Sequence, residues 1–326
     1  MKKVLKWLGI IVLVIIIFIG ASFYYVFNMK PDVGDAPDLT VELTPERIER
    51  GDYLANSVCV CMDCHSTRDW SQYAAPIVEG TFGGGGERFD RTMGFPGNFY
   101  SKNITPYGVG DWTDGELFRA ITTGVDKDGE PLFPVMPYHY YGQLAEEDIY
   151  SIIAYVRSLP SLKTEVPARE VDPPMNIIMR LIPHKGEPRP VPQPEDKVAY
   201  GEYMTLASGC IECHTPVNDK GQIFTDSAFC GGRVFDMPFG TLRTPNLTPH
   251  NTGLGMWNED LFVSKFKQYQ DSNYHSPTLD MMNGDFNTIM PWMMYSTMTD
   301  RDIKAIYAYL QTVKPIEHEV VKFTKR

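Results

Sequence analysis

Cys61-Met62-Asp63-Cys64-His65 is the stretch of the chain on which the fold depends. On a helical turn, positions i, i+3 and i+4 share one face, so two thiols and an imidazole at this spacing meet the same flat ligand. CxxCH is the attachment signature of c-type haem: the thiols form thioethers with the porphyrin and the histidine binds the iron. For a single copy, half a zinc site, a thioredoxin-like CxxC and a structural disulfide are the alternatives.

The same pattern returns 149 residues later as Cys210-Ile211-Glu212-Cys213-His214. Five further landmarks recur around it in the same order, so the chain contains a tandem duplication. The pairs are Gly51-Asp52-Tyr53 and Gly201-Glu202-Tyr203, Asn103-Ile104-Thr105-Pro106 and Asn246-Leu247-Thr248-Pro249, Trp112 and Trp257, Met136-Pro137 and Met290-Pro291, and the closing segments 148–156 and 302–310. The duplication favours haem attachment over the alternatives, and it predicts two haem c groups held by Cys61, Cys64, Cys210 and Cys213.

Two irregularities distinguish the copies. The first CxxCH begins ten residues after Gly51 and the second nine residues after Gly201, which indicates a one-residue insertion at Cys59-Val60. An insertion near residues 267–287 puts nine more residues between Trp257 and Met290 than between the equivalent pair in the first copy.

The two motif histidines, His65 and His214, are predicted to be the proximal iron ligands. Methionine is the usual sixth ligand in cytochromes c. Met136 and Met290 are predicted for this role, because each occupies the same place in its repeat and the following proline restrains the loop. The competitors are His139 for the first iron and Met293, Met294 and Met298 for the second, while His275 is expected to be exposed to solvent.

Four other repeated side chains are candidates for contact with the haem propionates: Asn103, Trp112, Asn246 and Trp257. For the indoles, simple core packing is an equal alternative. The Asn-x-Thr triplets also fit the N-glycosylation pattern, but their equivalent positions before proline indicate a shared structural role. Gly51 and Gly201, set against Tyr155 and Tyr309, are expected to mark close helix crossings.

The composition limits the class of protein. The chain has 326 residues, enough for two domains, and a net charge of -11, which argues against a nucleic-acid partner. Cys59 and Cys230 lie outside the haem motifs. They are expected to be buried thiols, with a disulfide between them as the alternative.

Residues 7–27 form an uncharged run of 21 residues, long enough to span a bilayer as a helix. Lysines precede the run and aspartates follow it, so the positive-inside rule places the N-terminus in the cytoplasm and the rest on the periplasmic side of a bacterial inner membrane. A cleaved signal peptide is the alternative, although its apolar core is usually shorter. The lysines are Lys2, Lys3 and Lys6, and the aspartates are Asp32, Asp35 and Asp38.

These features predict six segments. Residues 1–28 form a transmembrane anchor and 29–43 a tether. Residues 44–160 form the first haem domain, whose first helix is expected to begin with Thr44 as its N-cap and Pro45 in the first turn. A proline-rich linker covers 161–194 and includes a short apolar helix at 175–182. The second haem domain covers 195–318, and 319–326 form a tail.

The repeated motifs, the Met-Pro segments and the closing helices resemble those of the multi-haem cytochrome c subunits of bacterial alcohol, gluconate and aldehyde dehydrogenases. The resemblance covers roughly residues 44–313. It implies an all-α fold with two tandem class I cytochrome c domains after one N-terminal transmembrane helix, and His/Met-ligated haems. The implied partners are a membrane or periplasmic dehydrogenase, a quinol-oxidising complex or a terminal oxidase.

Electron transfer is therefore the predicted function, since paired haems can relay single electrons without a substrate pocket. The alternative is a di-haem enzyme, peroxidase-like or thiosulfate-oxidising, which needs one haem with an open or displaceable sixth position.

Overall fold

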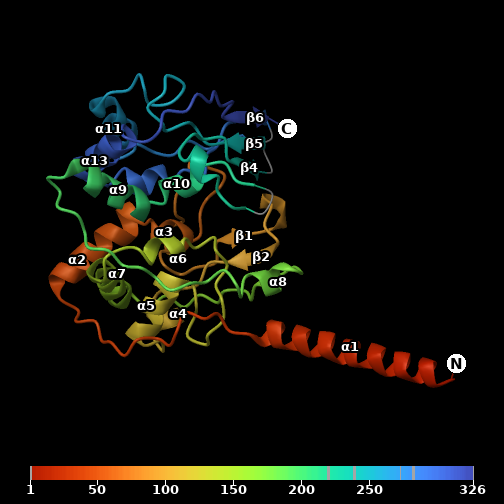
Figure 1. Cartoon of the computed structure of the whole chain (residues 1–326). Coiled ribbons are helices and arrows are strands. Elements are labelled where there is room, and N and C mark those ends of the chain that lie inside the picture. Colours follow the sequence, from red (N-terminus) through yellow and green to blue (C-terminus); the bar gives the residue numbers. More distant parts are fainter. Residues whose placement is uncertain (1, 219–220, 238–239, 272, 281–282, 326) are drawn as a thin grey trace.

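The computed structural model describes residues 2–325, apart from 219–220, 238–239, 272 and 281–282. Helix α1 (Lys2–Asn28) projects from one side of a body that holds the other elements (Figure 1), and none of its side chains is buried. Within the described chain it is the one helix long and apolar enough to cross a membrane. A membrane anchor and a signal sequence share these properties.

The body contains two copies of one helix pair. Helix α2 (Pro45–Tyr53) crosses α7 (Glu146–Ser158), and α9 (Lys197–Ala207) crosses α13 (Asp300–Leu310). We call residues 45–158 the first repeat and 197–310 the second repeat. A Cβ on Gly51 would lie 1.9 Å from the Ser151 carbonyl oxygen, and one on Gly201 would lie 1.9 Å from that of Ala305. Glycine is required at both crossings, as predicted.

Local sequence explains where these helices begin. Thr44 caps α2 by accepting a hydrogen bond from the Arg47 backbone N–H, with Pro45 in the first turn, which confirms the predicted start. The remaining α-helices are α3 (Cys61–Cys64), α4 (Pro106–Val109), α5 (Asp114–Thr123), α6 (Tyr138–Tyr141), α8 (Met175–Ile178), α10 (Cys210–Cys213), α11 (Glu259–Lys267) and α12 (Trp292–Tyr295). A π-helical turn covers Leu54–Val58, and 3-10 turns cover Arg91–Met93 and Thr225–Ser227.

Among the described residues, two small antiparallel sheets correct the expectation of an all-α fold. Strands β1 (Arg88–Phe89), β2 (Gly97–Tyr100) and β3 (Glu170–Val171) form one sheet in that order, with Phe89 opposite Phe99 and Gly97 opposite Val171. Strands β4 (Val234–Met237), β5 (Gly240–Arg243) and β6 (Phe323–Lys325) form the second. Each sheet pairs two strands within a turn-rich segment with a third strand that follows the closing helix. The strands have two to four residues and carry no long alternating pattern, so the sequence showed no sign of them.

The proline-rich stretch after the first repeat folds back onto that repeat. Strand β3 pairs with β2, and Met179 is 2% exposed at the end of α8. The predicted helix at 175–182 is confirmed in a shorter form as α8.

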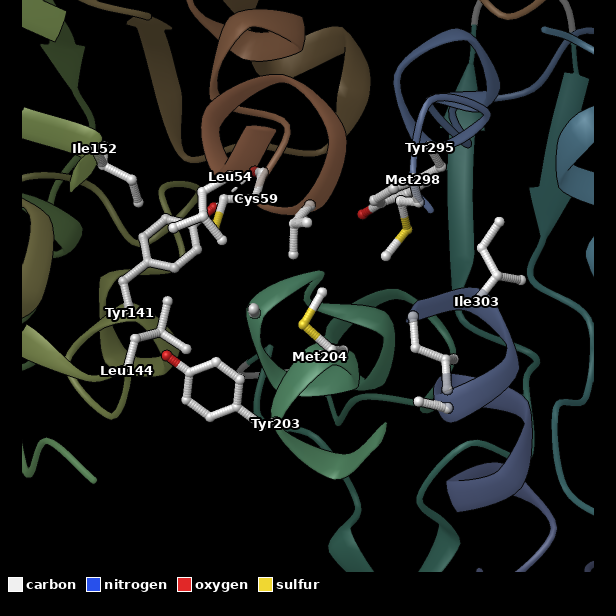
Figure 2. Close-up of a cluster of buried hydrophobic side chains, with 14 of the residues drawn as sticks. Leu54, Cys59, Tyr141, Leu144, Ile152, Tyr203, Met204, Tyr295, Met298 and Ile303 are labelled. Carbon is white, nitrogen blue, oxygen red and sulfur yellow. Dashed lines mark hydrogen bonds between the residues drawn. The ribbon is translucent and has the colours of Figure 1, made fainter. Parts of the chain in front are cut away.

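One hydrophobic cluster crosses from the first repeat to the second (Figure 2). Leu54 and Leu144 come from the first repeat, and Met204, Met298 and Ile303 come from the second, each at most 1% exposed. Because this core is shared, the two repeats pack as one body.

Reciprocal hydrogen bonds reinforce the contact between the repeats. The Tyr203 hydroxyl donates to Asp148 Oδ2 (2.7 Å) and accepts from the Ala145 N–H (3.1 Å). In the other direction, the Tyr53 hydroxyl donates to Asp302 Oδ2 (2.5 Å) and accepts from the Thr299 N–H (3.0 Å). Tyr53 and Tyr203 are equivalent positions, as are Asp148 and Asp302. The repeats therefore exchange the same bond in both directions.

The insertion in the second repeat lies against the first repeat. Leu279 N–H donates to the Ser71 carbonyl (2.8 Å), and Tyr73 N–H donates to that of Pro277 (3.0 Å). His275 is exposed there, as predicted.

Candidate haem-binding sites

The two CxxCH motifs form the same structure. Each occupies a single helical turn, α3 or α10, and the backbone N–H of its histidine donates to the carbonyl of its first cysteine at 2.9 Å for both His65 and His214. This i to i+4 bond places both cysteines and the histidine on one face of the turn. The structure thus brings together the three predicted groups of each motif.

Each histidine ring is oriented by a backbone carbonyl. His65 Nδ1 lies 2.7 Å from the Lys102 carbonyl oxygen, and His214 Nδ1 lies 2.9 Å from that of Pro245. A carbonyl can only accept, so Nδ1 carries the proton and Nε2 is left with its lone pair. A ligand histidine in proteins commonly has this arrangement.

The carbonyl that accepts a hydrogen bond from each histidine ring is held in place by the Asn-x-Thr segment that follows it in the chain. Asn103 Oδ1 accepts from the N–H (2.9 Å) and hydroxyl (2.7 Å) of Thr105, while its Nδ2 donates to the Leu162 carbonyl (2.8 Å). Asn246 repeats this pattern with Thr248, at 2.8 Å for both bonds, and with Ile316 at 2.8 Å. Both asparagines are buried. The shared structural role is confirmed, and a contact between these amides and a propionate stays a prediction.

Burial controls the protonation of the motif side chains. It raises the pKa of Cys61, Cys64 and Cys210 to about 12 and that of Cys213 to about 11, so the thiols are neutral. Burial also lowers the pKa of His214 to about 4 and that of His65 below its usual value. In each case the hydrogen bond to the carbonyl acts to raise the pKa, and burial outweighs it. Neutral imidazoles can bind iron.

A zinc site fits these residues poorly. Zinc in a structural site usually has four protein ligands. Across the part of the chain that the structure describes, no group of three or more His, Cys, Asp or Glu side chains is placed to hold a metal ion. The pair of thiols and one imidazole on a single turn fits haem c instead, which needs one protein nitrogen and two thiols on the same face.

Met136 and Met290 occupy matching loops. The carbonyl of each accepts a hydrogen bond at 2.8 Å from the residue two positions later, Tyr138 or Trp292, and a short helix follows, α6 or α12. Both methionines are half-buried and pack against the hydrophobic cluster that also contacts Cys61. Each is thus held at the same place in its repeat.

The competing ligands have other contacts. His139 Nε2 lies 3.8 Å from Glu212 of the second repeat. Met298 is fully buried in the shared core, and Met294 packs against a separate cluster around Met62. Met293 Sδ accepts a hydrogen bond from Ser276 at 3.9 Å.

Trp112 and Trp257 are each tied to the closing helix of their own repeat. The Trp112 carbonyl accepts a hydrogen bond from Arg157, and the Trp257 carbonyl accepts one from the Tyr307 hydroxyl (2.6 Å). Both indoles are half-buried and pack against the shared core. Contact of the indole N–H groups with a propionate stays a prediction.

Arginine partners of the acids inside the motifs are site residues that sequence reasoning missed. Arg68 is 7% exposed and binds both Asp63 (2.8 Å) and Glu87 (3.1 Å). Arg233 is 20% exposed and binds Glu212 at 2.6 Å. An acid between the two cysteines of each motif was the available signal, but nothing in the sequence indicated which arginine would reach it.

The two motif acids titrate in opposite directions. Burial raises the pKa of Asp63 and outweighs the attraction of Arg68, and the nearby Glu87 carboxylate adds to this increase. Burial also acts to raise the pKa of Glu212, but hydrogen bonds from Arg233 and Tyr140 and the nearby His139 ring outweigh it and lower that pKa to about 2. The first motif therefore lies in the less favourable environment for a negative charge.

Cys59 and Cys230 are free and buried, as expected. The predicted disulfide alternative is absent.

Comparison with known proteins defines the class. Residues 198–314 match the family model described as Cytochrome c, so the chain carries a cytochrome c domain that includes the second CxxCH turn. A domain of this kind implies haem c.

The chain is more particularly similar to cytochrome subunits of dehydrogenases. It is 31% identical over 284 residues to the fructose dehydrogenase cytochrome subunit of Gluconobacter japonicus, covering 82% of this chain and 52% of that protein. It is 27% identical over 301 residues to the cytochrome c subunit of the quinone alcohol dehydrogenase of Komagataeibacter europaeus, covering 87% and 59%. The chain thus spans little more than half the length of these relatives.

A third relative has a length closer to that of this chain. The "Diheme cytochrome c-type" protein of Cereibacter sphaeroides is 28% identical over 268 residues, covering 79% of this chain and 83% of that protein.

Proposed function

We propose that the chain is a membrane-anchored di-haem cytochrome c that transfers electrons for a dehydrogenase. The observation that carries this proposal is the duplicated site: two CxxCH turns, each with its histidine Nδ1 bonded to a backbone carbonyl. The family model covers the second repeat, and the matching hydrogen bonds of the first repeat support a second cytochrome c domain there.

In this proposal, Cys61, Cys64, His65 and Met136 hold the first haem. Cys210, Cys213, His214 and Met290 hold the second. Each iron, when bound, accepts and gives up one electron. The chain contributes the rest: the Lys102 and Pro245 carbonyls fix the histidine rings, and the shared apolar core packs against Cys61 and Cys210.

The proposed organisation follows the predicted segments, with an anchor at 1–28, haem domains at 44–160 and 195–318, and the linker between them. The charge asymmetry around α1 supports a location on the periplasmic side of the inner membrane. The names of the dehydrogenase cytochrome subunits support a membrane or periplasmic dehydrogenase as the electron donor.

Two spectroscopic measurements test the proposal. A pyridine haemochrome titration of the purified full chain is expected to give two haems per chain, and one or none contradicts the proposal. The oxidised protein is expected to show the near-infrared methionine–iron band from both haems. A high-spin haem that reacts with peroxide instead indicates a di-haem enzyme.

A methionine replacement tests the ligand assignment. Met136→Ala is expected to remove the methionine–iron band of one haem and to lower the potential of that haem, while both haems stay covalently attached. Met293→Ala is the matched control and is expected to keep both bands. An unchanged spectrum in Met136→Ala rules out Met136 as the ligand.

A further inference from the structure

The segment after the first repeat presents an apolar surface beside the end of α1. Met179 anchors α8 to the body at 2% exposure, whereas Ile178 is 40% exposed and Leu181 is 63% exposed. Arg180, between these two, donates from Nη1 to the carbonyl of Met29 (3.1 Å) and from Nη2 to Glu130 (3.0 Å). Ile178 and Leu181 are therefore close in the chain to a residue, Arg180, that is hydrogen-bonded to the backbone just beyond α1.

The chain that leaves α1 is bound to the body and does not hang free. Lys30 Nζ donates to the Asp128 carbonyl (2.6 Å), and the Val41 N–H donates to Asp114 (2.8 Å). Val33 and Val41 are buried at 7% and 6% exposure. The body is consequently held in one orientation relative to the C-terminal end of α1.

The length of α1 sets the depth of this region in a membrane. An uncharged run of 21 residues spans about 31 Å as a helix, close to the thickness of a bilayer core. The run ends at Phe27, after Phe23, Tyr24 and Tyr25, and aromatic side chains of this kind favour the membrane interface. Met29, two residues beyond, then lies at headgroup depth, and Arg180 lies with it.

The charge of the segment suits a lipid surface. The chain as a whole has a net charge of -11, but residues 175–185 contain no carboxylate and carry His184 and Lys185 in addition to Arg180, which is paired with Glu130. His184 and Lys185 are both exposed. Apolar side chains flanked by basic ones match the boundary between acyl chains and anionic headgroups.

We propose that residues 175–185, the α8 segment, contact the lipid surface beside α1, with Ile178 and Leu181 inserted among the lipids. This inference rests on the proposed membrane anchor. It assigns the body a second point of attachment, and two points together fix the tilt of α1 and of the body over the membrane.

Photo-crosslinking of the full chain tests the contact. The protein is reconstituted into vesicles of phosphatidylethanolamine and phosphatidylglycerol that contain a phospholipid with a diazirine in its acyl chain, and the adducts are mapped by mass spectrometry. Adducts are expected on α1 and on the peptide that carries Ile178 and Leu181. The control peptide carries Met256, which is 77% exposed and lies three residues before α11 in the chain. Helix α11 is on the far side of the body from α1 (Figure 1).

A variant separates the contact from chance labelling. Ile178→Ser combined with Leu181→Ser is expected to reduce labelling of the α8 segment to that of the Met256 peptide, with α1 labelled as before. Both side chains are exposed, so an unchanged circular dichroism spectrum is expected. Labelling of α1 alone overturns the lipid contact and leaves the anchor standing. Labelling of neither overturns both, and equal labelling of the α8 and Met256 peptides also overturns the contact.

Discussion

The two repeats reach the same haem-binding turn by different routes. In the second repeat, α9 ends at Ala207 and Gly209 adopts a left-handed conformation (φ 62°) before Cys210. In the first repeat, the π-helical turn Leu54–Val58 intervenes, with Cys59 N–H bonded to the Leu54 carbonyl at 2.7 Å, and Val60 takes the left-handed position (φ 46°). The wider π turn absorbs the extra residue that the sequence showed at Cys59-Val60.

This difference shows which part of the site is under strict geometric control. The left-handed residue before the first cysteine is kept in both repeats, even where it falls on valine, for which that conformation is unfavourable. The helix before it tolerates an insertion. The surroundings also differ, because a buried arginine binds two carboxylates beside the first motif and a more exposed one binds a single carboxylate beside the second.

The largest difference between the repeats is expected on removal of these arginines. Arg68→Gln leaves Asp63 and Glu87 buried without their cation, and it is expected to lower the free energy of unfolding by about 3–5 kcal/mol. Arg233→Gln is expected to cost about 1 kcal/mol, because Tyr140 still donates to Glu212 at 2.9 Å. Denaturation of the full chain in detergent, followed by circular dichroism, measures both. Equal losses contradict the proposed asymmetry of the two motifs.

Replacing Tyr53 or Tyr203 is expected to cause a smaller loss in the free energy of unfolding, and the loss is expected to be equal in both repeats. Tyr203→Phe and Tyr53→Phe each remove a donor from a buried aspartate and an acceptor from a backbone N–H, at an expected cost of about 1–2 kcal/mol each. Tyr150→Phe is the control, since its hydroxyl makes only an exposed contact of 3.4 Å with Glu146, and no measurable loss is expected there. A loss in only one of the two test variants shows that the contact is not symmetric in energy.

Exchanging the left-handed residues is expected to give the smallest single effect, at Val60, and a loss of stability similar to that of the tyrosine variants at Gly209. Gly209→Val places a branched side chain in that conformation and is expected to cost about 1–2 kcal/mol. Val60→Gly relieves the backbone strain, but it also increases the conformational entropy of the unfolded chain and removes an apolar side chain. These effects oppose each other, so the free energy of unfolding is expected to change by less than about 1 kcal/mol. Gly209→Asn is the matched control, because asparagine tolerates this conformation. If Gly209→Val were neutral, the left-handed residue would not be a requirement of the turn. The same unfolding assay in detergent distinguishes these outcomes.

The sequence predicted the parts of the molecule that depend on local patterns. The CxxCH turns, the Thr44 cap, the closing helices and the glycine crossings each follow from residues a few positions apart, or from the repetition itself. Repetition supported these predictions more strongly than local patterns did, because a feature that recurs at the equivalent place in two copies is under the same constraint in both.

Features that depend on distant contacts were not predictable in this way. The Tyr203–Asp148 bond joins residues of different repeats. Both belong to repeated landmarks, but the repetition did not indicate that they would meet. Strand β3 forms only because the segment after α7 returns to β2. Arg68 became recognisable as a site residue once the fold had placed it between two buried acids.

The reciprocal bonds between Tyr53 and Asp302 and between Tyr203 and Asp148 bear on the ancestry of the chain. A single repeat carries both a donor tyrosine and an acceptor aspartate, so two identical copies related by a two-fold axis would satisfy each other completely. That is the definition of an isologous dimer interface. Joining two such subunits in one polypeptide would keep both bonds and hold the copies at a ratio of one to one. It would also leave one copy free to carry an insertion such as that at 267–287.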